Sequence, residues 1–157
     1  DREVAIQGWA VGAGMEWALN CDFPIWAESA RGFFPEAQWG LSVTGGVSAI
    51  LPAIVGPAKA KELILLGEKH SADELHQLGI AWRVVPDEQL SNEADTLAKK
   101  LATLSSRSLA DLKQGIHLGM LGHLETVLAY ETNATVAGAC DRSTLTTIKT
   151  FSHSSPA

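Results

Sequence analysis

The sequence predicts an α/β fold in which short buried strands come first and helices follow. Two observations predict it. Residues 1–56 hold most of the glycines and tryptophans and several short apolar runs, a composition typical of strands joined by tight turns. From residue 57 onward, apolar residues recur at the three- and four-residue spacing of amphipathic helices. The chain has 157 residues, 46% of them hydrophobic, which is typical of one domain with one core.

The first elements form a strand, a tight glycine turn, a helix and a second strand. Residues 4–7 and 23–27 are continuous apolar runs, as in strands buried on both faces. Between them, residues 14–21 contain Met, Glu, Ala and Leu and lack β-branched side chains, which favours a helix. A second glycine-rich turn, residues 40–48, leads into another apolar helix.

Stop and start signals divide the remainder of the chain into helices. Gly56 and Pro57 begin a helix that Gly67 ends, and Ser71 and Glu74 form a capping box for a helix over residues 71–78. Residues 80–85 read as one more strand. Helical patterns follow over residues 90–104, 109–120 and 124–136, then a short segment over 143–151 and a tail, residues 152–157, that we expect to fray.

Composition excludes several classes of partner. Twelve basic and 18 acidic residues are interspersed and give a net charge of −6, so we expect no nucleic-acid partner. No apolar stretch is long enough to span a membrane, so we expect a soluble protein without a membrane partner. Cys21 and Cys140 lie far apart, which favours a reducing compartment and a cytoplasmic location. The five histidines lack metal-ligand spacing, so no metal is expected.

The first glycine turn, residues 8–14, is a candidate anion site. Glycines let the backbone approach a ligand closely, and amides that open a helix face outward at the positive end of its dipole. A dinucleotide fingerprint would need a further glycine where this chain has Trp17. An oxyanion site remains, and the alternative is that the glycines only permit close packing.

Glu16 and Glu36 are candidates for a general acid and base, because each is an isolated carboxylate in apolar surroundings. Burial and mutual repulsion would separate their pKa values, so that one is protonated while the other is charged. The alternative for each is a structural acid held by backbone amides.

Several motifs, taken in order, resemble the crotonase superfamily, the enoyl-CoA hydratase and isomerase group. They occupy residues 8–22, 27–30, 34–36, 39–41, 51–52, 55–56 and 83–86. The resemblance implies a spiral of ββα units over residues 1–85, incomplete because the first units are missing, and a helical oligomerisation region over 86–157. It also implies homotrimers, often paired into hexamers, and an acyl-CoA thioester substrate. No separate cofactor is implied, since coenzyme A is part of the substrate.

The resemblance assigns roles to residues in and near the two glycine turns. The Ala13 amide falls on an oxyanion-hole donor, and Glu16 and Glu36 fall on the glutamates that hold and activate water. Four residues fall on substrate-binding positions: Gly12, Pro35, Trp39 in the acyl-pocket wall, and Thr44 in the loop whose amide positions the water.

Thr44 stands where members that dehalogenate aryl thioesters or isomerise dienoyl thioesters carry aspartate, which argues against those reactions. Two departures from the family pattern also affect this assignment. The glycine-rich stretch over residues 43–48 lacks the proline and the extra glycines usual in the family, which affects the loop geometry expected there. The family's first oxyanion donor and most of its CoA-binding loop precede the region matched here, so we expect the chain alone to be nearly inactive.

Three functions stay open. The first is hydration of a 2-enoyl-CoA thioester. The second is double-bond isomerisation at the same site, for which one glutamate suffices. The third is a non-catalytic scaffold that oligomerises through its helices.

Overall fold

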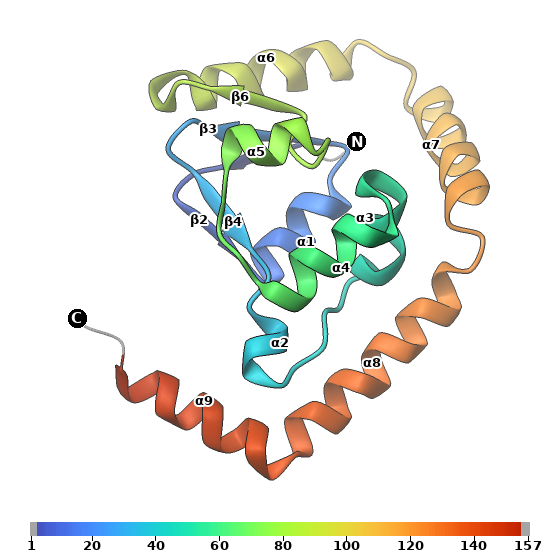
Figure 1. The fold of residues 1–157 in the computed structure, drawn as a ribbon. Helices are drawn as coiled ribbons and strands as arrows, with labels where there is room; N and C mark the ends of the chain where they lie inside the picture. The colour runs from blue at the N-terminus through green and yellow to red at the C-terminus, as the bar shows by residue number, and fades with distance from the viewer. Residues whose placement is uncertain (1–2, 155–157) are drawn as a thin grey trace.

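Two small sheets form the centre of the fold in the computed structural model, which describes residues 3–154 and side chains up to residue 149 (Figure 1). The first sheet has the order β1-β3-β6 and is parallel throughout. The second has the order β2-β4-β5, with a parallel and an antiparallel pair. The strands are β1 (Glu3–Ile6), β2 (Trp9–Val11), β3 (Phe23–Ala27), β4 (Arg31–Phe33), β5 (His70–Ser71) and β6 (Arg83–Val85).

Helices cover the sheets and then continue beyond them. Pro52 lies inside α3, and Gly56 separates α3 from α4. The helices are α1 (Ala13–Asn20), α2 (Glu36–Trp39), α3 (Val47–Val55), α4 (Pro57–Leu66), α5 (Ala72–Gln77), α6 (Leu90–Ala102), α7 (Ser106–Met120), α8 (Leu124–Cys140) and α9 (Arg142–Ser154), with a 3-10 turn at Asp87–Gln89.

The core lies around β3, the middle strand of the first sheet. Ile25, Trp26 and Ala27 of β3 have no exposed surface. Met15 of α1 packs into the same cluster. Gly32 of β4 completes it, and an added Cβ there would overlap the Met15 sulfur and lie 2.9 Å from the Trp26 ring.

The helix signals in the sequence are confirmed. Pro57 begins α4 and Gly67 ends it in a left-handed conformation. Ser71 and Glu74 make both hydrogen bonds of the capping box on α5. The segment expected over 143–151 belongs to α9, which continues through Ser154, so fraying is not seen in residues 152–154. Residues 155–157 of the expected frayed tail lie outside the described part.

The strand predictions need correction. β2, β4, β5 and the short helix α2 were not predicted, because each has only two to four residues and lacks a clear hydrophobic period. The strand expected over 80–85 is limited to Arg83–Val85. Burial on both faces holds for β3 but is wrong for β1, because β1 is an edge strand and its Ala5 is exposed.

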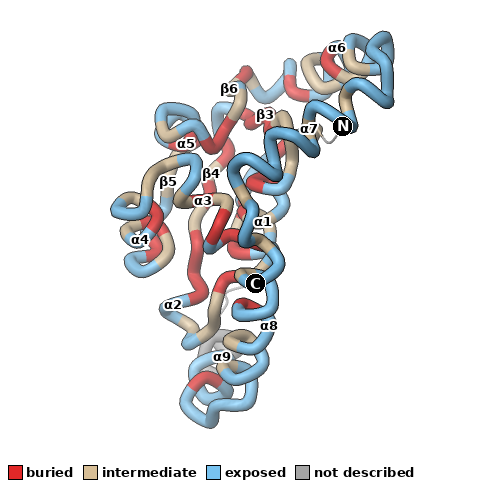
Figure 2. Tube along the Cα trace, turned by 90° about the vertical axis from the view of Figure 1, so that its right-hand side faces the viewer, coloured by how far each residue is buried: buried red, intermediate tan, exposed pale blue. Residues whose placement is uncertain are grey.

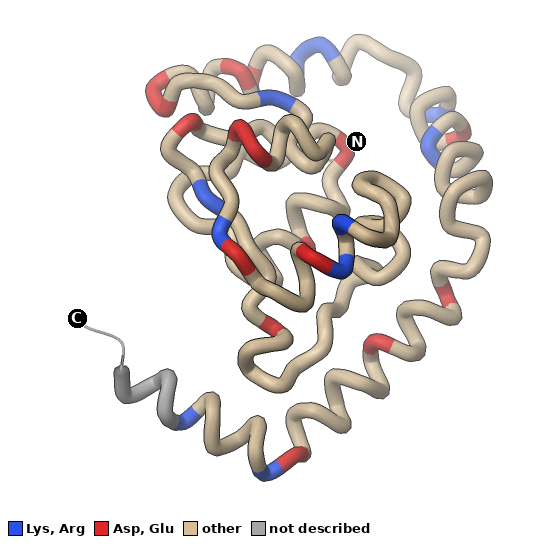
Figure 3. Tube along the Cα trace, in the orientation of Figure 1, with Lys and Arg blue, Asp and Glu red and all other residues tan. Residues whose placement is uncertain are grey.

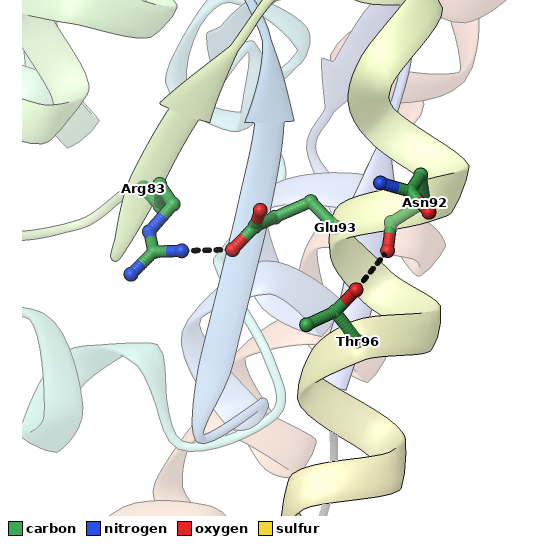
Figure 4. A network of polar contacts seen from close by, with 4 residues as sticks. All are labelled: Arg83, Asn92, Glu93 and Thr96. Atoms are coloured by element: carbon green, nitrogen blue, oxygen red, sulfur yellow. Dashed lines mark hydrogen bonds and ion pairs between the residues drawn. The ribbon is translucent and has the colours of Figure 1, made fainter.

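Helix α6 packs against the first sheet and is fixed to it by a polar contact. The Arg83 guanidinium of β6 donates to the Glu93 carboxylate of α6, and the Thr96 hydroxyl donates to the Asn92 carbonyl at 2.8 Å (Figure 4). Leu90 and Leu97 place the apolar face of α6 in the core. This helix thereby closes one side of the sheet.

The last three helices run around the outside of the core as an arm (Figure 1). Most of their described residues are exposed (Figure 2), and long stretches of the arm carry no charge (Figure 3). The Lys113 ammonium of α7 donates to the Asp22 carboxylate, which ties the arm to the turn after α1. Within the described residues, no helix combines the length and the apolar character required to cross a membrane.

We expect the substitution Gly32→Ala to lower the free energy of unfolding by about 1–3 kcal/mol, because the added methyl group overpacks the cluster around Met15 and Trp26. Urea unfolding measures the change. Gly115→Ala is the control, since an added Cβ at this site in α7 meets open space and should stabilise by about 0.5–1 kcal/mol. Equal effects of the two substitutions would contradict the packing described for Gly32.

Candidate active site

The turn between β2 and α1 presents the N-terminus of a helix. Gly12 precedes the helix with a φ of +50°, a conformation that favours glycine. Its N–H donates to the Phe33 carbonyl at 3.1 Å, which fixes the turn against β4. Ala13 is the first helical residue, and the amides of a first helical turn have no partner within their helix. The structure therefore places the Ala13 amide at the positive end of α1, as an oxyanion donor requires.

The Glu36 carboxyl lies against this helix N-terminus. Glu36 begins α2 and is 8% exposed. A Cβ added to Gly12 would lie 2.6 Å from the Glu36 Oε1, so only glycine at this position lets the carboxyl come so close. The other oxygen, Oε2, is buried and accepts no hydrogen bond from the described residues.

This environment raises the pKa of Glu36 above its ordinary value. Burial is the largest cause, because it penalises the charged form, and the nearby Glu16 carboxylate adds to it by repulsion. The backbone amide of Glu36 itself opposes the shift. Glu36 thus keeps its proton to higher pH than an ordinary glutamate does.

The Glu16 carboxylate, one turn into α1, accepts hydrogen bonds through both oxygens, whereas Oε2 of Glu36 accepts none from the described residues. The Glu16 Oε1 accepts from the Thr44 backbone N–H at 2.8 Å, and its Oε2 accepts from the Thr44 hydroxyl at 2.6 Å. Both oxygens accept, as an ionised carboxylate does. The two glutamates therefore lie close together in different environments, and one residue, Thr44, fixes the direction of the Glu16 carboxylate.

Two residues that support Thr44 were not predicted from the sequence. The Asn20 side chain donates to the carbonyls of Glu16 and Gly45, each at 2.9 Å, and so joins α1 to the Thr44 loop. Glu131 of α8 accepts hydrogen bonds from the amides of Gly46 and Ser48. Its spacing of three and seven residues from Leu128 and Leu124, which places it on their face of the helix, was the available signal.

The other predicted substrate-binding residues lie on α2 and beside it. Pro35 is buried and precedes α2, and its Cδ would lie 3.7 Å from a Cβ on Gly12. Trp39 ends α2 and is half-buried, and its role in an acyl pocket stays a prediction. A pocket of about 700 Å³ borders Glu16 on the side of the exposed Trp17 and the half-buried Cys21.

The arrangement provides general acid and base chemistry beside a helix N-terminus. A carboxyl with a raised pKa and a hydrogen-bonded carboxylate can give and take a proton at neighbouring atoms. Among the described residues, no group of three or more His, Cys, Asp or Glu side chains is placed to hold a metal ion.

Removing the charge of Glu16 should lower the pKa of Glu36. In Glu16→Gln the repulsion is gone, whereas burial still holds the Glu36 pKa above the ordinary 4.5. NMR titration of the Glu36 carboxyl carbon measures the shift. Glu74, whose pKa is lowered by hydrogen bonds from Ser71, is the internal control and should not move. An unchanged Glu36 titration would show that the two carboxyl groups do not interact.

The same shift predicts a dependence of stability on pH. Because folding raises the Glu36 pKa, the folded state binds the proton more tightly, and the stabilisation from that proton is complete below about 4.5. It is lost as the pH rises through the raised pKa. Urea unfolding between acid and neutral pH should show this loss, and Glu36→Gln should remove it.

Known proteins resemble this chain over most of its length. A sequence model described as enoyl-CoA hydratase/isomerase matches residues 4–144. The chain is 39% identical over 127 residues to the 1,2-epoxyphenylacetyl-CoA isomerase of Escherichia coli strain K12, covering 81% of this chain and 48% of the relative. It is 34% identical over 130 residues to the short-chain-enoyl-CoA hydratase of Clostridium acetobutylicum, covering 83% and 50%.

Solved structures show the same fold. The crystal structure of an enoyl-CoA hydratase from Mycobacterium avium subsp. paratuberculosis K-10 matches with a TM-score of 0.91 at 26% identity, covering 96% of this chain and 61% of that one. The chain spans about half the length of the curated relatives it matches. Because the family model and the relatives match most of the chain, the chain belongs to the enoyl-CoA hydratase/isomerase family, the crotonase superfamily.

Proposed function

We propose that the protein containing this chain adds water across the double bond of a 2-enoyl-CoA thioester and forms a 3-hydroxyacyl-CoA. The observation that carries this proposal is the pair of Glu36, whose pKa is raised by burial, and Glu16, whose two oxygens accept hydrogen bonds from Thr44. The printed name of the Clostridium acetobutylicum relative supports it, since that protein is a short-chain-enoyl-CoA hydratase.

The two carboxyl groups divide the reaction between them. The water lies between Glu16 and Glu36, and Glu16 takes one of its protons as the oxygen bonds to C3 of the enoyl group. The C2–C3 double bond opens, and Glu36 delivers its proton to C2. Glu16 ends protonated and Glu36 ionised, and transfer of one proton from Glu16 back to Glu36 restores the site. Glu36, whose pKa is raised, thus begins the cycle with the proton that it delivers.

The Ala13 amide stabilises the charge that forms on the thioester oxygen during this addition. It lies at the N-terminus of α1, where the helix dipole favours negative charge. One such donor contributes about 10² to 10³ in rate. We assign the second donor and the CoA-binding loop to parts of the protein outside this chain, which is why the chain alone should be nearly inactive.

Isomerisation of the double bond is the second candidate. The Escherichia coli relative is an isomerase by name, and moving a proton between two carbon atoms needs only one carboxyl group, such as Glu36. Product mass separates the two reactions, because hydration adds a water molecule and isomerisation leaves the mass unchanged. A scaffold without catalysis is the third candidate, and it predicts no binding of CoA thioesters by calorimetry.

Replacing Glu36 by Gln should slow hydration about 10² to 10⁴-fold, because glutamine cannot deliver the proton to C2. Loss of enoyl-thioester absorbance measures the rate in the full-length protein. The matched control is Glu68→Gln, the same substitution at an exposed residue after α4, which should leave the rate unchanged. Wild-type rates in Glu36→Gln would rule out this role for Glu36.

We also propose that the arm assembles copies of the protein into a homotrimer, or a hexamer of paired trimers. Leu112, Ile116 and Met120 of α7 recur every four residues and are 63%, 58% and 51% exposed. A stripe of this kind is costly in water and is typical of a surface covered by another subunit. We assign a second copy of the protein as the partner that covers this stripe, because the family builds its oligomers from this helical region.

Placing a charge in the stripe should break the assembly. Ile116→Glu buries a carboxylate in an apolar contact between subunits, so sedimentation velocity should show a smaller species. Gln114→Glu adds the same charge two residues away on the opposite face of α7 and should leave the mass unchanged. An assembly that survives Ile116→Glu would contradict the proposed interface.

The cytoplasm is the compartment we propose. The two cysteines, Cys21 and Cys140, are far apart in the chain and are not joined by a disulfide. A protein without disulfides is suited to a reducing compartment.

A further inference from the structure

One face of α8 is seated on the loop that carries Thr44. Leu124, Leu128 and Glu131 follow one another at four- and three-residue intervals, the spacing of one helix face. A Cβ added to Gly46 would lie 2.9 Å from Leu124 and 3.7 Å from Leu128, so both leucines cover this glycine. Glu131 is the only buried residue of α8 and is 1% exposed.

Glu131 caps the N-terminus of α3. Its Oε2 accepts from the Gly46 N–H at 2.7 Å, and its Oε1 accepts from the Ser48 N–H at 2.8 Å. A carboxylate at this end of a helix is favoured by the dipole and satisfies amides that have no partner within the helix. A side chain more than 80 residues away in the sequence thereby closes the end of the Thr44 loop.

The arm also holds the other end of this loop. The Thr144 hydroxyl of α9 donates to the Gly40 carbonyl at 3.2 Å, and Gly138 of α8 packs closely on the same carbonyl. Residues 41–44 between these two contacts belong to no helix or strand. The position of Thr44 is therefore set by contacts at either end of the loop and by its bonds to Glu16.

We propose that Glu131 is a positioning residue, which holds Thr44 where it orients the Glu16 carboxylate toward the reacting water. The path runs from Glu131 to the Gly46 and Ser48 amides, along two residues of backbone to Thr44, and from Thr44 to both oxygens of Glu16. The effect of these contacts on catalysis rests on the function proposed above, whereas the effect of Glu131 on the position of Thr44 does not. Through it, the arm that we assign to assembly also shapes the active site.

The variant Glu131→Gln tests the path. Glutamine keeps the shape of the side chain but presents a donor where one backbone amide needs an acceptor, so one of the two bonds is lost. Hydrogen exchange should become about tenfold faster or more at the Gly46, Ser48 and Thr44 amides. The matched control is Glu125→Gln, the same change at an exposed residue of the same helix, which should leave these amides unchanged.

Kinetics of the full-length protein test the catalytic consequence. We expect Glu131→Gln to lower kcat about 10²-fold with little change in KM, because Glu16 loses its orientation while the thioester site stays intact. Glu131→Asp keeps the charge but is shorter, and should restore part of the loss. In the background of Thr44→Val, Glu131→Gln should have a smaller effect, since both changes act through Glu16.

Each outcome bears on a separate claim. Unchanged exchange at Thr44 in Glu131→Gln, or an equal change in Glu125→Gln, would overturn the positioning role. So would fully additive effects of Glu131→Gln and Thr44→Val on kcat. If the wild-type protein does not hydrate enoyl thioesters, the proposed function fails, and faster Thr44 exchange in Glu131→Gln alone would still support the path from Glu131.

Discussion

Two carboxyl groups lie close enough to influence each other, and the site depends on how differently they are surrounded. Glu36 is buried against the start of α1, where Gly12 leaves room for it, and its pKa is raised chiefly by the loss of water. Glu16 has two strong donors from Thr44. Glu36 is therefore adapted to keep a proton, and Glu16 is held in one orientation by its donors, which suits separate acid and base roles.

This difference is produced by three segments far apart in the sequence. The glycine turn before α1 supplies the amide and the space, the residues before α2 bring Glu36 across from β4, and the loop before α3 brings Thr44. None of these segments could hold its position alone. The arm closes the arrangement, because Glu131 and Thr144 bind the backbone at the two ends of the Thr44 loop.

The arm thus has two faces with different consequences. Its inner face contributes the buried polar side chains of Glu131 and Thr144, and both bind the backbone of the Thr44 loop. Its outer face leaves apolar side chains such as Leu118 and Tyr130 well exposed. A segment that packs so sparsely on its own core gains most of its stability from what covers it, which is consistent with the proposed assembly.

Local sequence signals determined the helices with clear caps. Pro57, Gly67 and the Ser71–Glu74 box act within one turn of chain, so no distant contact was needed to predict α4 and α5. The motifs around Glu16 and Glu36 likewise marked both acids as candidates. Strands β2 and β4 and helix α2 could not be predicted, because three or four residues form an element only when a neighbour supplies their partners.

The tertiary structure alone decided how firmly Glu36 holds its proton and which residues fix the Glu16 carboxylate. The pKa of Glu36 follows from how deeply the fold buries it, and no sequence pattern measures burial. In the sequence, Glu131 is a single acidic residue within a predicted helix. Its partners Gly46 and Ser48 are more than 80 positions earlier, so no local pattern connects them to it. Sequence determines the chemistry that each side chain can perform, whereas only folding sets the dielectric and the donors around it.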